Sequence, residues 1–224
     1  MNFRYPIFLD LSAKKCLVTG EGYEIAAKVQ ALVDAGANVL YVNPRAEPPI
    51  QALAQFGLIS WERRGFGRQD LDGCFLVISD QESNREIFRL AEQRGILCNA
   101  VDDPEHCRFS FGSVYRQGDL AIAISTNGIA PAIAVRLRER FEREIGPEYG
   151  ELLDMLRDVR AEIGMRLADF GARRALWYQI VDSGILAKLR AGERREAEAA
   201  LRQMIEEAVN STSRSDTSHD SAVR

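Results

Sequence analysis

A short apolar run that ends in two glycines constrains this chain more than any other feature. Residues 16–19 have the apolar and β-branched character of a buried strand; Gly20-Glu21-Gly22 and then a helical pattern from Tyr23 follow them. Glycines at a strand-to-helix turn let the backbone approach a pyrophosphate, and the N–H groups and dipole of the helix attract its charge. A dinucleotide site is therefore the first hypothesis, and a purely structural turn is the alternative, because short glycine motifs also arise by chance.

The residues after this turn extend it to a βαβ unit. Ile25, Val29 and Leu32 fall on one helical face, and Gly36 ends the helix before a run of strand formers at 38–42. This pattern has the length of about 30 residues that a strand–helix–strand unit needs. It strengthens the dinucleotide hypothesis.

The end of the second strand is where the ribose of a dinucleotide is usually held. An Asp or Glu about 20 residues past the glycines commonly fills that position, but this chain has Asn43, followed by Pro44 and Arg45. Asn43 can still bond a ribose, and the nearby Arg45 leaves NADP open as well as NAD. The expected cofactor-binding residues are Gly20, Glu21, Gly22, Tyr23, Glu24, Asn43, Pro44, Arg45, Ser79 and Asp80.

Composition and charge exclude several classes of protein. At 224 residues the chain can bury a sizeable core, as one large domain or two small ones. Its net charge of −4 argues against a nucleic-acid partner bound through the phosphate backbone. No apolar run approaches the ~20 residues of a membrane span, and residues 1–10 lack the pattern of a signal peptide. We therefore expect a cytoplasmic protein with no membrane partner.

Strand and helix patterns alternate through the first half of the chain. Residues 58–61, 74–78 and 96–100 have the composition of three further strands, and residues 81–94 carry a helical apolar face. Alternating strands and helices predict an α/β fold with a parallel sheet covered on both sides. We predict a Rossmann-type dinucleotide-binding domain over residues 1–108.

The pattern changes in the second half. Residues 109–115 and 120–125 flank a polar turn, which predicts an antiparallel hairpin, and a helix is expected to begin at Pro131. These elements are too short to bury their apolar faces alone. We therefore predict that residues 109–146 form a dimerisation region that pairs across a two-fold axis.

The remainder of the chain has helical patterns only. Apolar stripes at helical spacing predict a packed helical domain over residues 147–209. Residues 210–224, rich in Ser, Thr and charge, have nothing to bury and are predicted to be a disordered tail. His219 lies in that tail, so we expect no function for it.

Five segments occur in the order found in one known family. The segments are residues 5–11, 20–22, 99–104, 123–131 and 173–177. With the matching changes of secondary structure, they resemble the precorrin-2 dehydrogenase family, the N-terminal module of sirohaem synthase, some of whose members are also sirohydrochlorin ferrochelatases. The resemblance spans about residues 3–205.

The resemblance implies a fold and a reaction. It implies a Rossmann domain, a central dimerisation region and a C-terminal helical domain, and NAD-dependent oxidation of precorrin-2 to sirohydrochlorin by a homodimer. Iron insertion into sirohydrochlorin is a second activity of some members. Oxidising a reduced tetrapyrrole removes a hydride, which the nicotinamide accepts, and a proton, which needs a carboxylate or water. Asp102, just past the fifth strand, matches the aspartate that the family requires and is the expected catalytic residue, whereas Asp103 before Pro104 is expected to start a turn.

Two polar groups are candidates for contacts with the tetrapyrrole substrate. The run at 125–128 precedes the helix at Pro131, so its hydroxyl and N–H groups either cap that helix, the plainer interpretation, or hold a substrate carboxylate. Two arginines could pair with the acidic side arms, although solvated charges are an equally good interpretation. The expected substrate-binding residues are Ser125, Thr126, Asn127, Gly128, Arg108 and Arg116.

Some residues depart from the family pattern. Glu21 replaces a common glycine and sets a carboxylate near the pyrophosphate unless it turns away, Ile25 stands where a small residue is usual, and the loop at 79–84 is short. These departures leave two alternatives: a non-catalytic carrier or sensor that binds a tetrapyrrole or dinucleotide, and a chelatase with a degenerate NAD site. No metal site is expected, because His106 and Cys107 are adjacent on an extended segment and so point to opposite faces.

Overall fold

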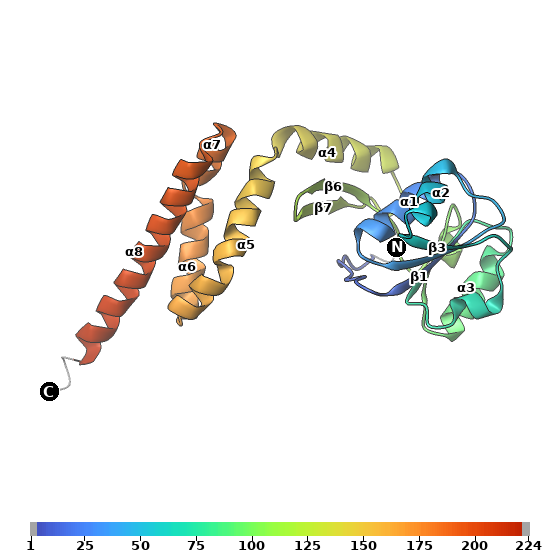
Figure 1. The fold of residues 1–224 in the computed structure, drawn as a ribbon, viewed down its shortest axis with the longest axis horizontal. Coiled ribbons are helices and arrows are strands. Elements are labelled where there is room, and N and C mark those ends of the chain that lie inside the picture. Colours follow the sequence, from blue (N-terminus) through green and yellow to red (C-terminus); the bar gives the residue numbers. More distant parts are fainter. Residues whose placement is uncertain (1–3, 221–224) are drawn as a thin grey trace. The chain divides into compact units, whose positions relative to one another are not determined.

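A computed structural model describes residues 4–220 of the chain (Figure 1). The chain divides into two compact units, residues 1–111, here called unit 1, and residues 112–224, here called unit 2. Unit 1 contains a parallel sheet with its covering helices, and unit 2 contains a hairpin followed by helices. This confirms the α/β fold class with a helical C-terminal part.

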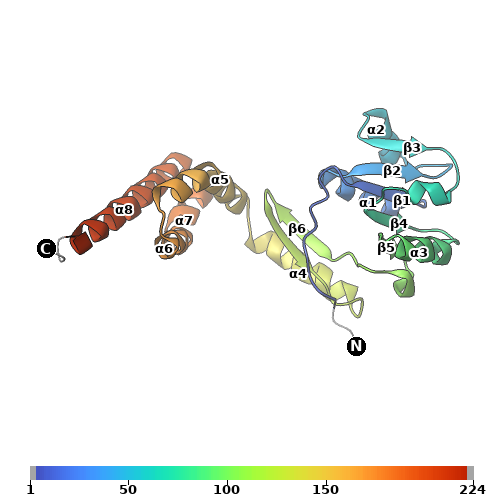
Figure 2. The same ribbon diagram turned by 90° about the horizontal axis from the view of Figure 1, so that it is seen from below.

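The sheet of unit 1 has five parallel strands in the order β3-β2-β1-β4-β5, side by side in Figure 2. In the centre of the sheet, Leu17 of β1 lies opposite Leu40 of β2 and Val77 of β4. Strands β2 and β3 are added on one side of β1, and β4 and β5 are added on its other side, so the strand order reverses between β1 and β4. Ligands bind outside the carboxyl ends of the strands at such a switch point. The strands are β1 (Lys15–Thr19), β2 (Asn38–Val42), β3 (Ile59–Glu62), β4 (Leu76–Ser79) and β5 (Leu97–Ala100).

Helices cover both faces of this sheet, which explains the continuous apolar runs in its strands. Val18 of β1 packs in one cluster with Ile25 and Val29 of the first helix, and Leu17 packs in the opposite cluster with Ile87 of the third. The branched Ile25 is therefore accommodated as a buried core residue. The helices are α1 (Tyr23–Asp34), α2 (Pro48–Gln55) and α3 (Asn84–Gln93), with short 3-10 turns η1 (Arg68–Leu71) and η2 (Pro104–His106).

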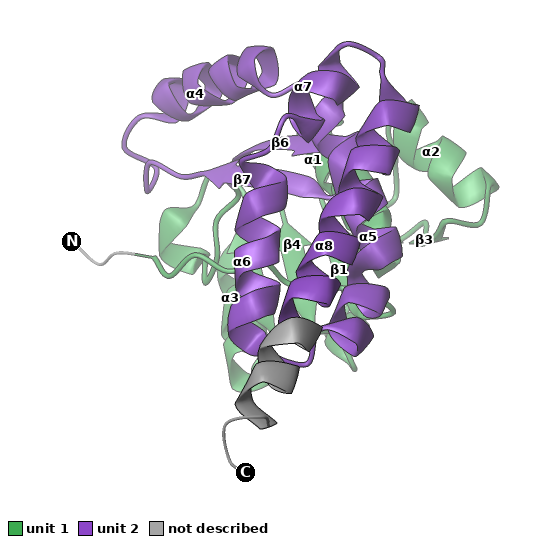
Figure 3. Cartoon of the chain, turned by 90° about the vertical axis from the view of Figure 1, so that its left-hand side faces the viewer, with its two compact units in different colours: residues 1–111 green, residues 112–224 purple. Residues whose placement is uncertain are grey.

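Unit 2, purple in Figure 3, begins with an antiparallel hairpin of β6 (Ser113–Gln117) and β7 (Leu120–Ile124). The first strand begins later and ends later than predicted, because Arg116 and Gln117 pair with β7 instead of forming the turn. The turn is reduced to Gly118 and Asp119, and Gly118 supplies the positive φ of 58° that a tight hairpin turn requires.

Five helices follow the hairpin within the described part of unit 2. Only Ala134 is buried along the first of them, whereas the later helices share an apolar cluster that includes Val159, Ile163, Leu176 and Leu201. The apolar stripes predicted from the sequence thus form a packed helical core. The helices are α4 (Pro131–Glu144), α5 (Glu148–Arg166), α6 (Phe170–Val181), α7 (Ile185–Arg190) and α8 (Arg194–Asp220).

The C-terminal boundary differs from the expectation of disorder after residue 209. Helix α8 continues to Asp220, and the hydroxyls of Ser211 and Thr212 donate to the carbonyl of Ala208 one turn earlier. The side chain of His219 and residues 221–224 lie outside the described residues. Along residues 4–220, no helix combines the length and apolar character needed to cross a bilayer.

Candidate functional site

Two glycines shape the turn between β1 and α1 in different ways. Gly20 has a φ of 129°, and a Cβ there would lie 2.7 Å from the Cβ and 2.9 Å from the carbonyl oxygen of Asp80. Gly22 has a φ of 93°. A Cβ at Gly22 would have no described atom within 4 Å other than those of its two chain neighbours. Gly20 therefore allows β1 and β4 to converge, and Gly22 leaves room for a ligand in front of α1.

The turn is tied to β2 by a buried tyrosine. The hydroxyl oxygen of Tyr41 lies 2.6 Å from the carbonyl oxygen of Gly20 and 3.1 Å from that of Arg45. Burial, assisted by the negative charges of Glu21 and Glu47, raises the pKa of Tyr41 to about 12. The hydroxyl thus stays protonated at neutral pH and donates to the glycine turn.

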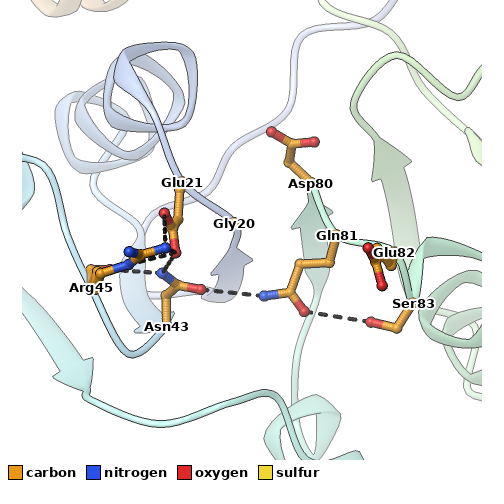
Figure 4. Close-up of a pocket in the computed structure, with 8 residues that line it drawn as sticks. All are labelled: Gly20, Glu21, Asn43, Arg45, Asp80, Gln81, Glu82 and Ser83. Atoms are coloured by element: carbon orange, nitrogen blue, oxygen red, sulfur yellow. Dashed lines mark hydrogen bonds and ion pairs between the residues drawn. The ribbon is translucent and has the colours of Figure 1, made fainter.

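A pocket of about 580 Å³ opens at the carboxyl ends of β1, β2 and β4 (Figure 4). It lies at the switch point between β1 and β4, where a Rossmann sheet binds its ligand. Five of the ten expected cofactor residues line it, together with Gln81, Glu82 and Ser83, which the sequence reasoning missed. The lining residues are Gly20, Glu21, Asn43, Arg45, Asp80, Gln81, Glu82 and Ser83.

The other expected cofactor residues lie outside the lining of this pocket. Tyr23 and Glu24 are in the first turn of α1, where Tyr23 is exposed and Glu24 pairs with Lys28 at 2.6 Å. Ser79 is buried at the end of β4, and its hydroxyl donates to the Asn84 side chain at 2.5 Å. Ser79 therefore closes the short loop before α3. Gly22 and the exposed Pro44 are also absent from the pocket lining.

Gln81 joins the ends of three strands inside the pocket. Its Nε2 donates to Thr19 Oγ1 at 2.6 Å and to Asn43 Oδ1 at 3.3 Å. Its own backbone N–H donates to the side chain of Asn84 at 3.0 Å. A polar residue two positions past a strand is the only sequence signal for this role, since the partners come from β1 and β2.

The Glu21 side chain points toward Asn43 and Arg45, which follow β2 (Figure 4). Its Oε1 accepts from Asn43 Nδ2 at 3.2 Å, and its carboxylate forms an ion pair with Arg45 at 3.1 Å. The Asn43 hydrogen bond, followed by the Arg45 interaction, holds the pKa of Glu21 below its usual value. Glu21 is therefore negatively charged at neutral pH.

Asp102 lies on the same carboxyl edge, two residues past β5. It is exposed and has a φ of 56°, a left-handed conformation in which Asp and Asn are the tolerated non-glycine residues. Burial first, and then the negative charges of Asp102 and Glu24, raise the pKa of Asp80. Asp80 and Asp102 are thus electrostatically coupled at this edge of the sheet.

The neighbours of Asp102 are engaged in local contacts. Asp103 precedes η2, and its carboxylate lies 2.7 Å from Nδ1 of His106. The thiol of Cys107 lies 3.1 Å from the carbonyl of Ala100. No cluster of three or more His, Cys, Asp or Glu side chains able to hold a metal occurs among residues 4–220.

The expected substrate-binding residues are divided between the two units. Arg108, in unit 1, bonds Glu92 at 2.8 Å and lies over the ring of Phe88. In unit 2, the backbone N–H of Asn127 donates to Ser125 Oγ at 3.1 Å, and that of Ala130 donates to Thr126 Oγ1 at 3.3 Å, so both hydroxyls organise the loop before α4. Asn127 and Gly128, with φ of 54° and 80°, complete this loop, and Arg116 projects from β6.

Three family models match successive parts of the chain. Residues 7–113 match a model described as putative NAD(P)-binding, residues 117–144 match the central region of sirohaem biosynthesis proteins, and residues 148–205 match the sirohaem synthase dimerisation region. The last match lies downstream of residues 109–146, the segment for which the sequence reasoning predicts dimerisation.

Sirohaem synthases are among the relatives. The chain is 33% identical over 204 residues to siroheme synthase of Nitrosococcus oceani, covering 90% of this chain and 44% of that protein. It is 35% identical over 208 residues to siroheme synthase 1 of Pectobacterium atrosepticum, covering 92% and 43%. The chain thus spans less than half the length of these relatives.

A solved structure supports the fold. The structure titled SirC, precorrin-2 dehydrogenase, matches with a TM-score of 0.72 and 20% identity, covering 89% of this chain and 99% of that one. At this identity the match establishes a shared fold, from the Rossmann sheet through the helical region.

Proposed function

Because the chain belongs to the family of sirohaem synthase N-terminal modules, with the NAD(P)-binding, central and dimerisation regions in order, we propose that it oxidises precorrin-2 to sirohydrochlorin with NAD+. The observation that carries the proposal is the pocket at the β1–β4 switch point, with the glycine turn on one side and Asp102 on the same edge. The named activity of SirC, a protein with this fold, agrees with it.

The residues of the pocket fit a dinucleotide. Gly22 leaves open space in front of α1, and no side chain among the described residues caps that helix, so its first N–H groups are available to a pyrophosphate. Glu21, held by Asn43, offers a carboxylate to a ribose at the end of β2. The bound nicotinamide supplies the hydride acceptor.

Asp102 is the proposed proton acceptor. Loss of a hydride from a reduced tetrapyrrole leaves a proton to be removed, and an exposed carboxylate at the sheet's carboxyl edge can take it directly or through one water. Burial, and then the negative charge of Asp102, raise the pKa of Asp80, so this second carboxyl group lies within electrostatic reach of the proposed base.

We assign the tetrapyrrole's carboxylate arms to cationic and hydrogen-bonding groups. Within unit 2 the candidates are Arg116 and the loop of residues 125–128, which precedes the N-terminus of α4 and carries two hydroxyls; within unit 1 the candidate is Arg108, taken by itself. Arginine binds carboxylates through paired hydrogen bonds, and a helix N-terminus favours an anion. We further propose a homodimer in the cytoplasm, in agreement with the match to a dimerisation region and with four cysteines that are all free.

The test is an assay of purified protein with precorrin-2 and NAD+. We expect the absorbance of NADH and the spectrum of sirohydrochlorin to rise together. Ferrous iron added afterwards separates a second, iron-inserting activity from the first. Binding of sirohydrochlorin with no NADH formed from precorrin-2 would contradict the proposal and favour a carrier or a chelatase.

A further inference from the structure

Glu21 brings a carboxylate to the place where the end of β2 lacks one. An acidic residue after the second strand usually accepts the ribose hydroxyls of a dinucleotide, and here that position is occupied by the neutral Asn43. Oε1 of Glu21 lies 3.2 Å from Nδ2 of Asn43 (Figure 4). The negative charge thus reaches the end of β2 from the glycine turn.

The orientation of Asn43 is fixed by its other partners. Asn43 is only 3% exposed, its Nδ2 donates to the carbonyl of Arg45 at 2.8 Å, and its Oδ1 accepts from Gln81 at 3.3 Å. The indole N–H of Trp61 donates to the backbone carbonyl of Asn43 at 2.9 Å. Because both ends of the amide are engaged, its N–H side faces Glu21 and holds that carboxylate at the ribose position.

Arg45 is the group that a 2′-phosphate would seek in this pocket. Its Nη2 lies 3.2 Å from Oε1 and 3.1 Å from Oε2 of Glu21, so its charge is already balanced by a carboxylate. A phosphate at the same place would meet the negative charge of Glu21. A ribose with free hydroxyls would instead find a charged acceptor, which makes the stronger class of hydrogen bond.

We infer that Glu21 is the specificity-determining residue of the dinucleotide site: it takes over the role of the acid missing at Asn43 and selects NAD+ over NADP+. Arg45 then acts as the counter-ion that positions Glu21. This inference rests on the proposed function, since it requires a dinucleotide in this pocket.

Isothermal titration calorimetry with NAD+ and with NADP+ tests the inference without any turnover. We expect the parent protein to bind NAD+ at least about tenfold more tightly than NADP+, the ratio that one hydrogen bond to a charged group provides. Glu21→Gln should weaken NAD+ binding by about tenfold, for the same reason, and strengthen NADP+ binding because Arg45 becomes free. Adding Arg45→Ala to Glu21→Gln should remove the gain for NADP+.

Glu86→Gln is the matched control. The Glu86 side chain is 47% exposed, as is that of Glu21, and it pairs with Arg68 at 2.8 Å on α3, outside the pocket. This variant loses the same charge from the same kind of ion pair, so both affinities should stay at the parent values. All variants should give the circular dichroism spectrum of the parent protein, because the replaced side chains are largely exposed to solvent. The exposed fraction is 47% for Glu21 and Glu86 and 81% for Arg45.

The outcomes separate this inference from the proposed function. If the parent protein binds neither dinucleotide, the proposed function and the inference both fail. If it binds NAD+ but Glu21→Gln leaves the NAD+ to NADP+ ratio unchanged, the inference alone is overturned. A parent protein that prefers NADP+ would overturn it as well.

Discussion

At the scale of single residues, the two glycines of the turn should respond differently to substitution. A Cβ at Gly20 would collide with the backbone of Asp80, so Gly20→Ala should lower the free energy of unfolding of unit 1 and reduce its thermal midpoint. Gly22→Val should cost about 1–3 kcal/mol, because the Gly22 backbone (φ 93°, ψ 166°) lies in a region that is essentially restricted to glycine. It should also abolish NAD+ binding, because the side chain fills the phosphate's space. Calorimetric unfolding and NAD+ titration of both variants check this. Unchanged NAD+ affinity in Gly22→Val would show that the motif is only a turn.

Asp102 offers the sharpest residue-level test of the chemistry. Asn tolerates the left-handed conformation found there, so Asp102→Asn should keep the backbone and NAD+ binding while removing the base. We expect kcat for precorrin-2 oxidation to fall by roughly 10²-fold or more, the usual range for a lost general base. Asp103→Asn, which weakens the contact with His106, should mainly lower stability. Oxidation at the parent rate by Asp102→Asn would refute the catalytic assignment.

A site residue could be predicted from the sequence when its place depends only on its distance from a strand end, and not when it depends on contacts between strands. Gly20, Asn43 and Arg45 lie within three residues of the ends of predicted strands, so their convergence at one edge follows from parallel topology. Gln81 could not be assigned in this way, because its partners Thr19 and Asn43 are identified only once β4 lies beside β1. The direction of the Glu21 side chain likewise depends on Asn43 and Arg45.

At the scale of elements, an ion pair between the buried Glu148 and the half-exposed Arg190 joins the start of α5 to the end of α7. Glu148 is buried and accepts from Nε of Arg190 at 2.7 Å. Burial alone would raise the pKa of Glu148, but the Arg190 hydrogen bond and backbone N–H groups outweigh it, so the pKa lies below its ordinary value of 4.5. The pair therefore stabilises unit 2 fully above that ordinary value, and the contribution is lost as the pH falls through the lower, folded-state pKa.

Replacement of Glu148 should reveal this contribution. Glu148→Gln keeps the shape but weakens a hydrogen bond between charged groups, so we expect a loss of about 1–3 kcal/mol at neutral pH. The difference between parent and variant should shrink on acidification. Urea unfolding at pH 7 and at pH 3.5 measures it, and an equal difference at both values would contradict the assignment of the charge.

Element boundaries were the weaker part of the sequence prediction. The alternation of apolar residues identifies the hairpin, but it does not determine whether Arg116 and Gln117 belong to the strand or to the turn. Pairing with β7 and the left-handed Gly118 decide for a two-residue turn. The stripes of α5, α6 and α8 were easier to predict, because helical spacing repeats over several turns.

At the scale of the whole molecule, the predicted homodimer has two candidate contact regions. The sequence reasoning favours the hairpin and α4, which leaves Ile133 56% and Leu137 37% exposed, whereas the dimerisation family model matches residues 148–205. Light scattering at micromolar concentration should give twice the chain mass of 25.1 kDa.

Two variants distinguish the two contact regions. We expect Ile133→Asp to give monomers, because a charge buried without a partner opposes association. We expect Tyr178→Asp, on the exposed side of α6, to leave the dimer intact. Monomers from Tyr178→Asp alone would instead assign the contact to the helical region, and a monomeric parent protein would exclude both.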